Sequence, residues 1–411
     1  MNAGQFFKPG EVLVQKFGGS SMASPERILK VAERIAEQAR VGRKMAIVVS
    51  AMGDTTDDLI SLMGRISPDP QPREIDQLLA TGEIVSVSVM AAALKRVGVK
   101  ARSFIATNLG IRTDDSFGNA QIVSFDRLRD IAGFLDEGGV AVIAGFQGVT
   151  SSGDITTLGR GGSDITAVAL ARELGQKLCE KFTDEDGVYT ADPRIIPNAR
   201  KVWHLDYNEM ESLANNGNGI LHIRSIAYAR DAAIRIHVRS SFSREEGSVI
   251  GPDGDPKNKI KSMAVDKKQA VMAIEGIRFS SGPGPDLKEK FGFPVTAVEW
   301  RSFDQIRGSL RVGFRLSDSF EAIPDLWEFS DSMDADEVRF TSHLAMISIV
   351  GCGLSADASL AARLVQPLQG QGLQPLLVDR DGIRLTLAIP QDQASLAMMS
   401  LHETMIALLK T

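Results

Sequence analysis

The sequence has little cysteine, no strong excess of charge and no long apolar run. Of its 411 residues only Cys179 and Cys352 are cysteines, and they lie far apart, which excludes a disulfide framework. No apolar run approaches the roughly 20 residues that span a bilayer. The first residues lack the basic start and apolar stretch of a signal peptide. The net charge of −6 gives no general reason to expect nucleic acid as a partner. We therefore expect a cytoplasmic protein with no membrane and no nucleic acid among its partners.

Two common ligand motifs are also missing. No GxxxxGK[ST] segment occurs, which argues against a P-loop nucleotide site. The acidic stretch "DEDG" (184–187) does not complete the spacing of an EF-hand loop, which argues against a calcium site. The hydrophobic content of 43% and the charged content of 24% are ordinary for a globular protein with a sizeable core. The length suits two or three domains.

Strand patterns and helix patterns alternate in the first half of the chain. Short β-branched runs predict buried strands, and the amphipathic stretches between them predict helices. This alternation predicts an α/β fold with a mostly parallel sheet covered on both faces. We expect strands at 12–17, 44–52, 139–146, 177–183 and 234–240, and helices at Pro25–Val41, Asp76–Arg96 and Ile165–Leu174.

The second half of the chain has a different composition and a different pattern of predicted strands and helices. Residues 247–262 are rich in Gly, Pro, Asp and Lys and are interpreted as a linker after a first domain at 1–246. Two small α+β units of the βαββαβ type are expected at 263–344 and 345–411. The first is degraded, because "SSGPGPDLKEKFG" leaves room for only about two helical turns. The second has helices at Ala356–Gln369 and Gln391–Leu409. Paired units without catalytic clusters favour a ligand-sensing or dimerising module.

A lysine and two glycines end the first predicted strand, in "KFGGSS". Gly18 and Gly19 let backbone N–H groups approach an anion, and Lys16 adds a mobile positive charge suited to a phosphoryl group. Ser20 adds a hydroxyl, and the helix that starts near Pro25 adds a positive dipole end. The alternative is a plain strand–turn–helix with a surface lysine, and the motif alone does not decide between them.

A second glycine-rich stretch, "GRGGSD", precedes a nearly all-apolar segment. Gly159, Gly161 and Gly162 make another turn that an anion can approach, and Arg160 has the planar fork that binds a carboxylate through two bonds. Ser163 or Asp164 can cap the following helix, and a pure cap needs no function. A cap does not explain an arginine between glycines, so we favour a binding role.

Two further stretches carry candidate polar groups. "FTDEDGVYTADPR" (182–194) leaves a strand at the edge where ligands of parallel sheets bind, although it is also typical of an acidic turn. Glu83 follows a Thr-Gly break and opens an apolar helix, where it can pair with an amino group or act as an ordinary helix N-terminal acid. Taken together, these parts suit phosphoryl transfer, which needs alignment and charge neutralisation more than covalent chemistry.

The same blocks, in the same order, resemble the aspartokinases of the amino-acid-kinase family, and they cover nearly all of the first 245 residues. The tail is similar to the paired ACT domains that bind lysine or threonine as feedback inhibitors in that family. The resemblance implies the three-layer amino-acid-kinase fold followed by two ACT-like units, in a homodimer or higher homo-oligomer. The blocks that carry it are "KFGGSS", "VVSAMGDTTDDL", "ATGEIVS", "GFQG", "TTLGRGGSDITAVALA", "TDEDGVYTADPRIIPNAR" and "HVRSSFS".

The resemblance implies transfer of the ATP γ-phosphoryl group to the β-carboxylate of L-aspartate, the first step toward lysine, threonine and methionine. Mg²⁺ is expected on the ATP phosphates, without a dedicated protein cage. Lys16 would stabilise the transferring group and Asp164 would hold Lys16. The implied aspartate site comprises Ser50, Thr55, Glu83 near the ammonium, Arg160 on a carboxylate, Gly161, Gly162 and Ser163. The implied nucleotide site comprises Lys16, Gly18, Gly19, Ser20, Thr183, Asp184, Tyr189, Asp192 and Arg194.

The chain departs from the family pattern in places. Gly219 stands where the family usually has a lysine that contacts the nucleotide, and a charged turn at 378–382 replaces hydroxyl residues of the second ACT unit. We therefore expect weak inhibition by lysine and threonine. Two alternatives stay open: a paralogue acting on a related acidic amino acid in a specialised pathway, and a non-catalytic amino-acid-binding subunit. Retention of Lys16 and Asp164 favours an enzyme.

Overall fold

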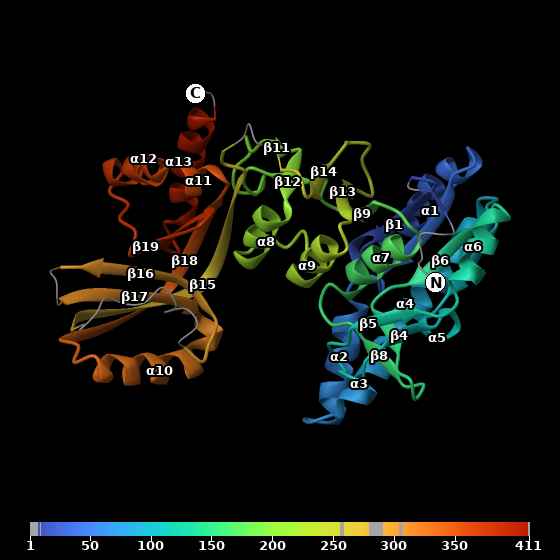
Figure 1. Ribbon diagram of the computed structural model, residues 1–411, viewed down its shortest axis with the longest axis horizontal. Coiled ribbons are helices and arrows are strands. Elements are labelled where there is room, and N and C mark those ends of the chain that lie inside the picture. Colours follow the sequence, from blue (N-terminus) through green and yellow to red (C-terminus); the bar gives the residue numbers. More distant parts are fainter. Residues whose placement is uncertain (1–6, 9, 255–258, 279–290, 304–306, 410–411) are drawn as a thin grey trace. The chain divides into compact units, whose positions relative to one another are not determined.

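The computed structural model describes residues 7–8, 10–254, 259–278, 291–303 and 307–409. The chain forms two compact units, which we describe separately (Figure 1). The first unit comprises Met1–Val188, Trp203–Glu211 and Ile220–Gly254. The second comprises Tyr189–Val202, Ser212–Gly219 and Asp255–Thr411. Two segments of the expected first domain therefore cluster with the C-terminal part of the chain.

The first unit is built on an eight-stranded sheet with the order β12-β14-β13-β9-β1-β2-β6-β3. Every neighbouring pair is parallel except β13 and β14, which confirms the mostly parallel sheet. A second sheet has the order β5-β4-β7-β8. The strands are β1 (Val12–Phe17), β2 (Lys44–Val49), β3 (Ala101–Phe104), β4 (Ile111–Thr113), β5 (Ile122–Phe125), β6 (Val140–Ala144), β7 (Gln147–Val149), β8 (Ile155–Thr157), β9 (Leu178–Thr183), β12 (His204–Asp206), β13 (Arg235–Ser240) and β14 (Ser248–Gly251).

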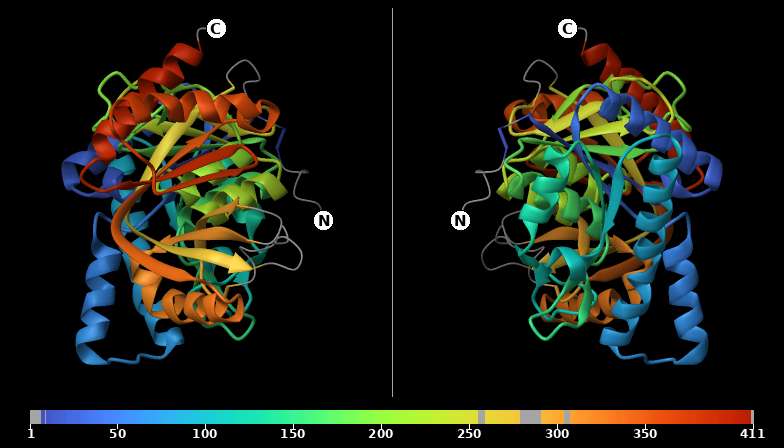
Figure 2. Two further views of the ribbon diagram at one scale, coloured as in Figure 1. Left: turned by 90° about the vertical axis from the view of Figure 1, so that its left-hand side faces the viewer. Right: turned by 90° about the vertical axis from the view of Figure 1, so that its right-hand side faces the viewer.

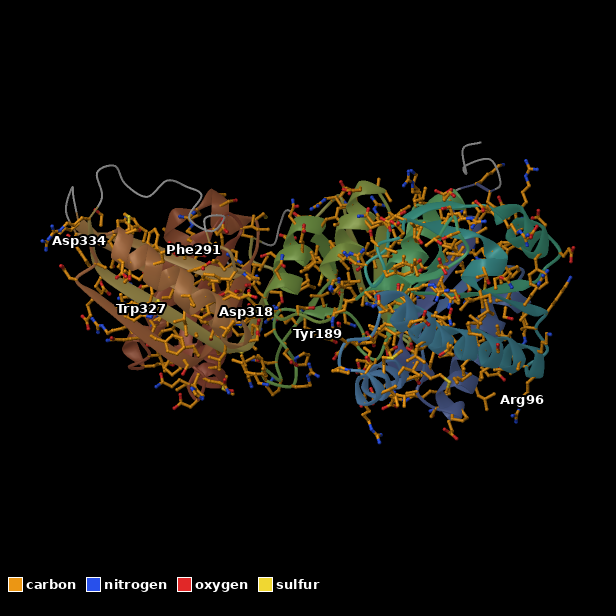
Figure 3. The ribbon with its side chains drawn as sticks, turned by 90° about the horizontal axis from the view of Figure 1, so that it is seen from below. Arg96, Tyr189, Phe291, Asp318, Trp327 and Asp334 are labelled. Atoms are coloured by element: carbon orange, nitrogen blue, oxygen red, sulfur yellow. The ribbon has the colours of Figure 1, made fainter. Side chains whose placement is uncertain are left out.

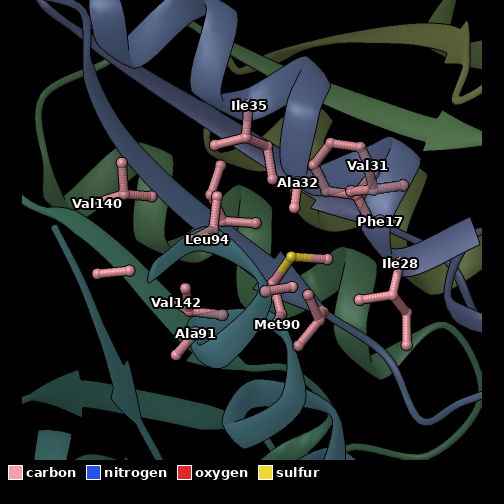
Figure 4. Close-up of a cluster of buried hydrophobic side chains, with 14 of the residues drawn as sticks. Phe17, Ile28, Val31, Ala32, Ile35, Met90, Ala91, Leu94, Val140 and Val142 are labelled. Carbon is pink, nitrogen blue, oxygen red and sulfur yellow. The ribbon is translucent and has the colours of Figure 1, made fainter. Parts of the chain in front are cut away.

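Helices pack on this sheet through apolar residues spaced at three or four. Helix α1 begins at Pro25, after Ser24, whose hydroxyl oxygen accepts the N–H of Arg27. Its buried face meets α4 and the central strands in one core (Figure 4). The helices up to residue 231 are α1 (Pro25–Arg40), α2 (Thr55–Ile66), α3 (Pro72–Leu79), α4 (Thr81–Arg96), α5 (Ala106–Leu109), α6 (Leu128–Asp136), α7 (Gly162–Glu173), α8 (Tyr207–Asn215) and α9 (Ile223–Asp231), with a 3₁₀ turn, η2, at Gly19–Met22.

The expected helix Asp76–Arg96 is two helices, α3 and α4, which meet at Ala80. Among the described residues, Pro72–Arg96 is long and apolar enough to cross a membrane by length and composition alone, which corrects the expectation that no apolar run reaches that length. Its apolar window is 56% buried inside the structure. Its buried members include the charged residues Asp76 and Glu83. These features are typical of a core helix.

The second unit contains a six-stranded antiparallel sheet with the order β16-β17-β15-β18-β20-β19. Helices α12 and α13 lie toward one end of this unit and α10, which carries Trp327, toward the other (Figures 1, 2 and 3). The elements are β15 (Ser262–Arg278), β16 (Val295–Ser302), β17 (Arg307–Arg315), η4 (Leu316–Asp318), α10 (Ser319–Ser332), β18 (Glu337–Val350), α11 (Gly353–Ala356), α12 (Ala358–Gly370), β19 (Leu377–Asp381), β20 (Arg384–Pro390) and α13 (Ala394–Leu408), with the short strands β10 (Val188–Tyr189) and β11 (Lys201–Val202) earlier in the chain.

The expected linker at 247–262 is partly structured. Ser248–Gly251 form β14, which pairs with β13, because the turn-forming residues begin only at Gly251. The expected helix Ala356–Gln369 is divided into α11 and α12, since Asp357 caps a new helix through its side chain. The expected short helix of the first ACT-like unit falls on 279–290, which lie outside the described residues.

Candidate active site

Three buried charged side chains meet at the carboxyl ends of two central strands. Lys16 on β1 and Lys181 on β9 are register partners. Lys16 Nζ lies 2.8 Å from Asp164 Oδ1, and Lys181 Nζ lies 2.6 Å from Asp164 Oδ2. Lys181 also donates to the carbonyl of Ile220 at 2.6 Å. A single carboxylate on α7 therefore holds two lysines from adjacent strands.

The charges of this cluster depend on one another. Burial disfavours the ionised carboxylate of Asp164, but the charges and hydrogen bonds of Lys16 and Lys181 outweigh it and lower the pKa to about 2. Burial also lowers the pKa of Lys181, and Asp164 opposes that effect. The ionised carboxylate is therefore what allows two ammonium groups to remain at a buried position.

The structure corrects the interpretation of Ser163 or Asp164 as a helix cap. Helix α7 begins at Gly162 after Gly161, and no side chain of the described residues caps it. Asp164 instead uses both oxygens on the two lysines. Lys181 was missed by the sequence argument. The available signal was a lysine inside the apolar strand pattern "LCEKFT", two residues before Thr183.

The first glycine turn packs closely against two neighbouring turns. The Gly18 N–H donates to the carbonyl of Phe182 at 3.1 Å. A Cβ at Gly19 would lie 3.0 Å from the Ala51 carbonyl oxygen and 3.1 Å from that of Gly53. A side chain at Gly19 would therefore push this turn away from the segment after β2.

Three of the predicted nucleotide residues come together beside this turn. The Ser20 hydroxyl donates to Asp184 Oδ1 at 3.2 Å, and the Thr183 hydroxyl donates to the same oxygen at 2.9 Å. Burial disfavours the charged Asp184, but these hydrogen bonds outweigh it and lower its pKa. Asp184 thus orients two hydroxyls at the end of β9.

A cavity of about 540 Å³ opens beside the lysine cluster. Most predicted aspartate-site residues line it, but Thr55 does not, because its hydroxyl donates to the Met52 carbonyl at 2.6 Å. Thr56 and Asp57 line that end instead. The lining residues are Lys16, Gly19, Ser50, Ala51, Gly53, Thr56, Asp57, Ile60, Ile75, Asp76, Leu79, Glu83, Gly118, Phe146, Thr157, Gly159, Arg160, Gly161, Gly162, Ser163, Asp164 and His222.

Glu83 is a buried carboxylate with only one satisfied oxygen. Oε1 accepts the N–H of Ala51 at 2.9 Å, whereas Oε2 has no hydrogen-bond partner among the described residues. Burial raises the pKa of Glu83 to about 7, against the opposing effects of the Ala51 N–H and the Lys16 charge. A cationic group entering the cavity would satisfy the free oxygen and stabilise the ionised form.

The loop that carries Arg160 is held in place by neighbours that the sequence argument did not identify. Asp76 Oδ2 accepts the N–H of Thr157 at 2.6 Å and that of Gly118 at 2.8 Å. Arg224 donates to the carbonyl of Leu158. These bonds fix the backbone of Thr157 and Leu158, just before the loop. Arg160 is therefore held at a defined place in the cavity wall.

Two glycines make this loop possible. Gly159 and Gly161 have φ values of 72° and 74°, which favour glycine. A Cβ at Gly161 would lie 2.6 Å from the Cβ of His222. His222 was also missed, and burial, with the charges of Arg224 and Arg160, lowers its pKa.

The remaining predicted nucleotide residues belong to the second unit. Tyr189, Asp192 and Arg194 lie in the segment 189–202. Asp192 Oδ1 accepts the backbone N–H of Arg194 at 2.9 Å, and Asp192 Oδ2 lies 2.9 Å from Arg194 Nη2. No group of three or more His, Cys, Asp or Glu side chains in the described part of the chain is arranged to hold a metal ion.

Comparison with known proteins connects this geometry to a family. Residues 11–240 match the Amino acid kinase family. A protein of Geobacillus stearothermophilus named Aspartokinase is 37% identical over 397 residues, which are 95% of this chain and 96% of that protein. One of Thermus thermophilus with the same name is 37% identical over 398 residues, 95% of this chain and 98% of that protein. The crystal structure of E. coli aspartokinase III with aspartate and ADP shares the fold, with a TM-score of 0.73 and 22% identity over 96% of this chain and 99% of that one.

Proposed function

This chain belongs to the aspartokinases of the amino acid kinase family, and we propose that its first unit binds L-aspartate beside the lysine cluster and phosphorylates its β-carboxylate with ATP. The observation that carries the proposal is the set of charged residues that line the cavity. Lys16, Arg160 and Glu83 line one space of about 540 Å³. The other buried acids of its wall are already engaged, Asp76 by the N–H groups of Thr157 and Gly118 and Asp164 by the two lysines. Aspartate carries two carboxylates and one ammonium group, so the charges of the ligand and the wall are complementary.

Each charged group takes one part of the substrate. Arg160 binds a carboxylate through its planar fork, because the backbone just before its loop is fixed. Glu83 accepts the ammonium group on its free Oε2. Ser50 and Ser163 line the same cavity and contribute hydroxyls. Thr56 replaces Thr55 in this role, since only Thr56 lines the cavity.

The chemical step forms a bond between a β-carboxylate oxygen and the γ-phosphorus, while the bond to the β-phosphate oxygen of ADP breaks. Lys16 stabilises the charge on the transferring group, and Asp164 fixes Lys16 in its position. Lys181 occupies the other oxygen of Asp164. No proton transfer is required, because the attacking carboxylate is already ionised at neutral pH.

The nucleotide is held by the glycine turn and the residues that follow β9. Gly18 and Gly19 let a phosphate approach the backbone closely because they lack side chains, and Asp184 fixes Ser20 and Thr183 beside them through their hydroxyls. The family resemblance assigns Tyr189, Asp192 and Arg194 to the nucleotide, and these residues lie in the second unit. Mg²⁺ would accompany the ATP phosphates and neutralise part of their charge.

The proposal also covers the cellular location, the oligomeric state and the effector of the enzyme. We place it in the cytoplasm, as a homodimer or higher homo-oligomer, with the second unit as the region that senses an amino-acid effector. E. coli aspartokinase III, which shares the fold, has been crystallised with lysine and aspartate. The product, 4-phospho-L-aspartate, is an acyl phosphate, and its formation is the first step toward lysine, threonine and methionine.

A coupled assay of ADP release is the direct test. We expect turnover with L-aspartate and ATP, and no turnover when aspartate is omitted. Turnover on another acidic amino acid with no activity on aspartate would favour the specialised paralogue. Aspartate binding without ADP release under any condition would favour a non-catalytic subunit and contradict the proposal.

A further inference from the structure

The second unit contains a cavity of about 620 Å³ that takes no part in the function proposed above. Its lining residues come from strands β15, β16, β17, β18 and β19 and from helix α12, all within the second unit. We propose that this cavity binds a small anion with two or more acidic groups, carboxylate or phosphate. The inference goes beyond the proposed function and is independent of it, because no residue of the first unit takes part.

The cavity lies over the face of the sheet that is turned away from α10. On β15, Met272 and Ile274 belong to the core under α10, whereas Ala273 and Glu275 line the cavity. Successive side chains of a strand point to opposite faces, so these two pairs lie on opposite sides of the sheet. Figure 1 shows α10 below β16 and β17 and α12 above them.

Two arginines and a glutamate stand in one row across this second face. Arg339 on β18 is the register partner of Ala273 on β15, which is in turn the partner of Arg311 on β17. Arg311 is also the partner of Glu299 on β16. Directly opposite residues of antiparallel strands point to the same face, and the strands of Arg339 and Arg311 are about 9–10 Å apart. Because Ala273 has only a methyl group, it leaves space between the two arginines.

Glu299 holds Arg311 and a third arginine beside the cavity. Arg301 places Nη2 at 2.7 Å and Nε at 2.8 Å from Glu299 Oε1. Arg311 Nη1 lies 3.5 Å from Glu299 Oε2, which also accepts the N–H of Val378 at 3.2 Å. The Glu299 side chain is only 10% exposed. One nearly buried carboxylate therefore fixes two guanidinium groups on this face.

Most N–H groups of the three arginines have no acceptor among the described residues. A guanidinium group carries five N–H donors. Arg311 donates to the carbonyl of Leu376 at 2.7 Å. Arg339 pairs through Nε, which lies 3.1 Å from Glu337 Oε1. The remaining donors are the groups that recognise carboxylate and phosphate oxygens.

The charge along the cavity is positive. The three arginines are accompanied by one lining carboxylate, that of Glu275, which lies 3.7 Å from Arg311 Nη2. With Glu299 included, three cations stand against two carboxylates, which leaves one positive charge in excess. The Glu337 side chain is 56% exposed, so water and salt screen its charge.

This arrangement defines the chemical class of the ligand. The arginines on either side of Ala273 can each hold one acidic group of the same molecule through two bonds. Thr341 and Gln369 line the same cavity and add polar groups, and Val365 adds an apolar surface for a short carbon chain. The excess positive charge repels an ammonium group, so an anion without an amine fits better than an amino acid.

The test is titration calorimetry of the full-length protein with citrate and with inorganic pyrophosphate, at fixed ionic strength and without Mg²⁺. We expect binding at millimolar concentration or below. Arg311→Gln and Arg339→Gln should each weaken it by roughly tenfold or more, the effect of one lost charge-assisted hydrogen bond. Tighter binding of citrate would indicate a polycarboxylate ligand, and tighter binding of pyrophosphate would indicate a phosphate-bearing one. Either result supports the proposal.

Two further variants separate a binding site from general effects of charge and stability. Arg315→Gln removes a charge from the same strand, but Arg315 does not line the cavity and lies 3.2 Å from Asp266. Its affinity should stay within about twofold of the parent, because a screened charge outside the site contributes little. Glu275→Gln should bind the anion more tightly, since it removes the lining carboxylate. A variant that only loosened the fold would not gain affinity.

Arg160→Ala controls for the cations of the first unit, which also attract anions. Binding that is lost in Arg160→Ala and kept in Arg311→Gln would place the anion in the first unit and overturn the proposal. So would the absence of binding of either probe at millimolar concentration, equal weakening in Arg315→Gln, or displacement of bound citrate by lysine. Phosphorylation of aspartate does not enter these measurements, so the proposed function can fail while this inference holds, and the reverse.

Discussion

Lys16 and Lys181 are register partners on neighbouring parallel strands, and their ammonium groups bind the two oxygens of one carboxylate, that of Asp164. The cluster has one positive charge in excess. Only Lys16 and Asp164 of the three line the cavity, so the excess charge is presented to a ligand by Lys16. Lys181 balances Asp164 from the far side. The arrangement gives a fixed cation without the conformational freedom of an exposed lysine.

Replacing Lys16 by alanine should abolish turnover without unfolding the protein. A single well-placed group that offsets charge in the transition state contributes about 3–4 kcal/mol, which corresponds to a loss of a hundredfold or more in kcat. The coupled assay measures the loss, and circular dichroism checks the fold. Activity within tenfold of the parent would refute the assignment of Lys16.

Lys181→Met is the matched comparison, because it removes the other cation of the cluster and keeps most of the buried volume. Since Lys181 does not line the cavity, we expect a smaller loss of kcat than in Lys16→Ala. An equal or larger loss in Lys181→Met would transfer the main electrostatic role to Lys181.

Arg160→Lys tests the carboxylate contact. The substitution keeps the charge and loses the two-bond geometry of the guanidinium. We expect the KM for aspartate to rise by about tenfold or more, the effect of one lost charge-assisted hydrogen bond, with the KM for ATP nearly unchanged. Titration of both substrates is the measurement, and a change confined to ATP would place Arg160 on the nucleotide side.

Much of the fold could be predicted from the sequence because its signals are local. The buried strands are nearly continuous apolar runs and the amphipathic helices repeat at a period of 3.6, and the predicted strands at 12–17 and 44–52 agree with β1 and β2 to within a few residues. The break between α3 and α4 at Ala80 was missed, although the Thr-Gly pair at the start of α4 marks its place. The assignment of β14 to the sheet depends on pairing with β13, which composition does not reveal.

The parts of the site that could be predicted are those whose residues are neighbours in the sequence. The glycine turns with Lys16 and Arg160 are contiguous in sequence, and both line the cavity. Lys181 and Asp76 were missed because their roles come from neighbours that are remote in sequence. Asp76 accepts the backbone N–H groups of Thr157 and Gly118. The sequence around a helical aspartate does not indicate hydrogen bonds to residues so far away.

Glu83 should make aspartate binding depend on pH near neutrality. Burial raises its pKa to about 7, so below that pH the carboxyl becomes neutral and loses its attraction for an ammonium group. We expect the KM for aspartate to rise about fivefold between pH 7 and pH 6, following the ionised fraction. Glu83→Gln should have a high KM for aspartate at both values and a flat profile. A parent KM that does not change over this range would contradict the assignment.

The same group should cost stability at alkaline pH. A carboxyl whose pKa is raised on folding favours the folded state below its unfolded pKa of 4.5, and this advantage is lost as the pH rises through about 7. The cost at pH 8 is roughly 3 kcal/mol. Glu83→Gln keeps an acceptor for the Ala51 N–H and removes the charge. Its melting temperature should exceed that of the parent at pH 8, and the difference should shrink at pH 5.

Gly219→Lys should strengthen ATP binding. A Cβ at Gly219 would have no neighbouring heavy atom within 4 Å, so a side chain fits there without displacing its surroundings. A restored lysine–phosphate contact is a charge-assisted hydrogen bond, which corresponds to about a tenfold lower KM for ATP. Gly219→Met is the control, because it has a similar length and no charge. An unchanged KM for ATP in the lysine variant would mean that a side chain at residue 219 takes no part in phosphate binding by this chain.

Feedback inhibition is the last property on which the chain should differ from its relatives. The charged residues at 378–382 were expected to form a turn, but Leu377–Asp381 are strand β19, paired with β20, and their charged groups already have partners. Arg380 Nε donates to the carbonyl of Leu354, in helix α11, at 3.1 Å. Arg384 Nη2 lies 3.4 Å from Asp379 Oδ2 and 3.3 Å from Asp381 Oδ2. An amino acid that entered here would have to displace these contacts, and each buried group left unpaired costs about 1–3 kcal/mol.

We therefore expect weak or no inhibition by millimolar lysine and threonine, added singly or together. An inhibitor acts only through different affinities for two conformations, and internal pairing of Arg380 and Arg384 reduces what a ligand can gain in either one. ADP release at ATP and aspartate concentrations near their KM values is the measurement. Arg380→Ser, which frees the Leu354 carbonyl and supplies a hydroxyl, should be more sensitive than the parent if the arginine is what blocks that carbonyl. Strong concerted inhibition of the parent would show that an effector pocket survives elsewhere in the second unit.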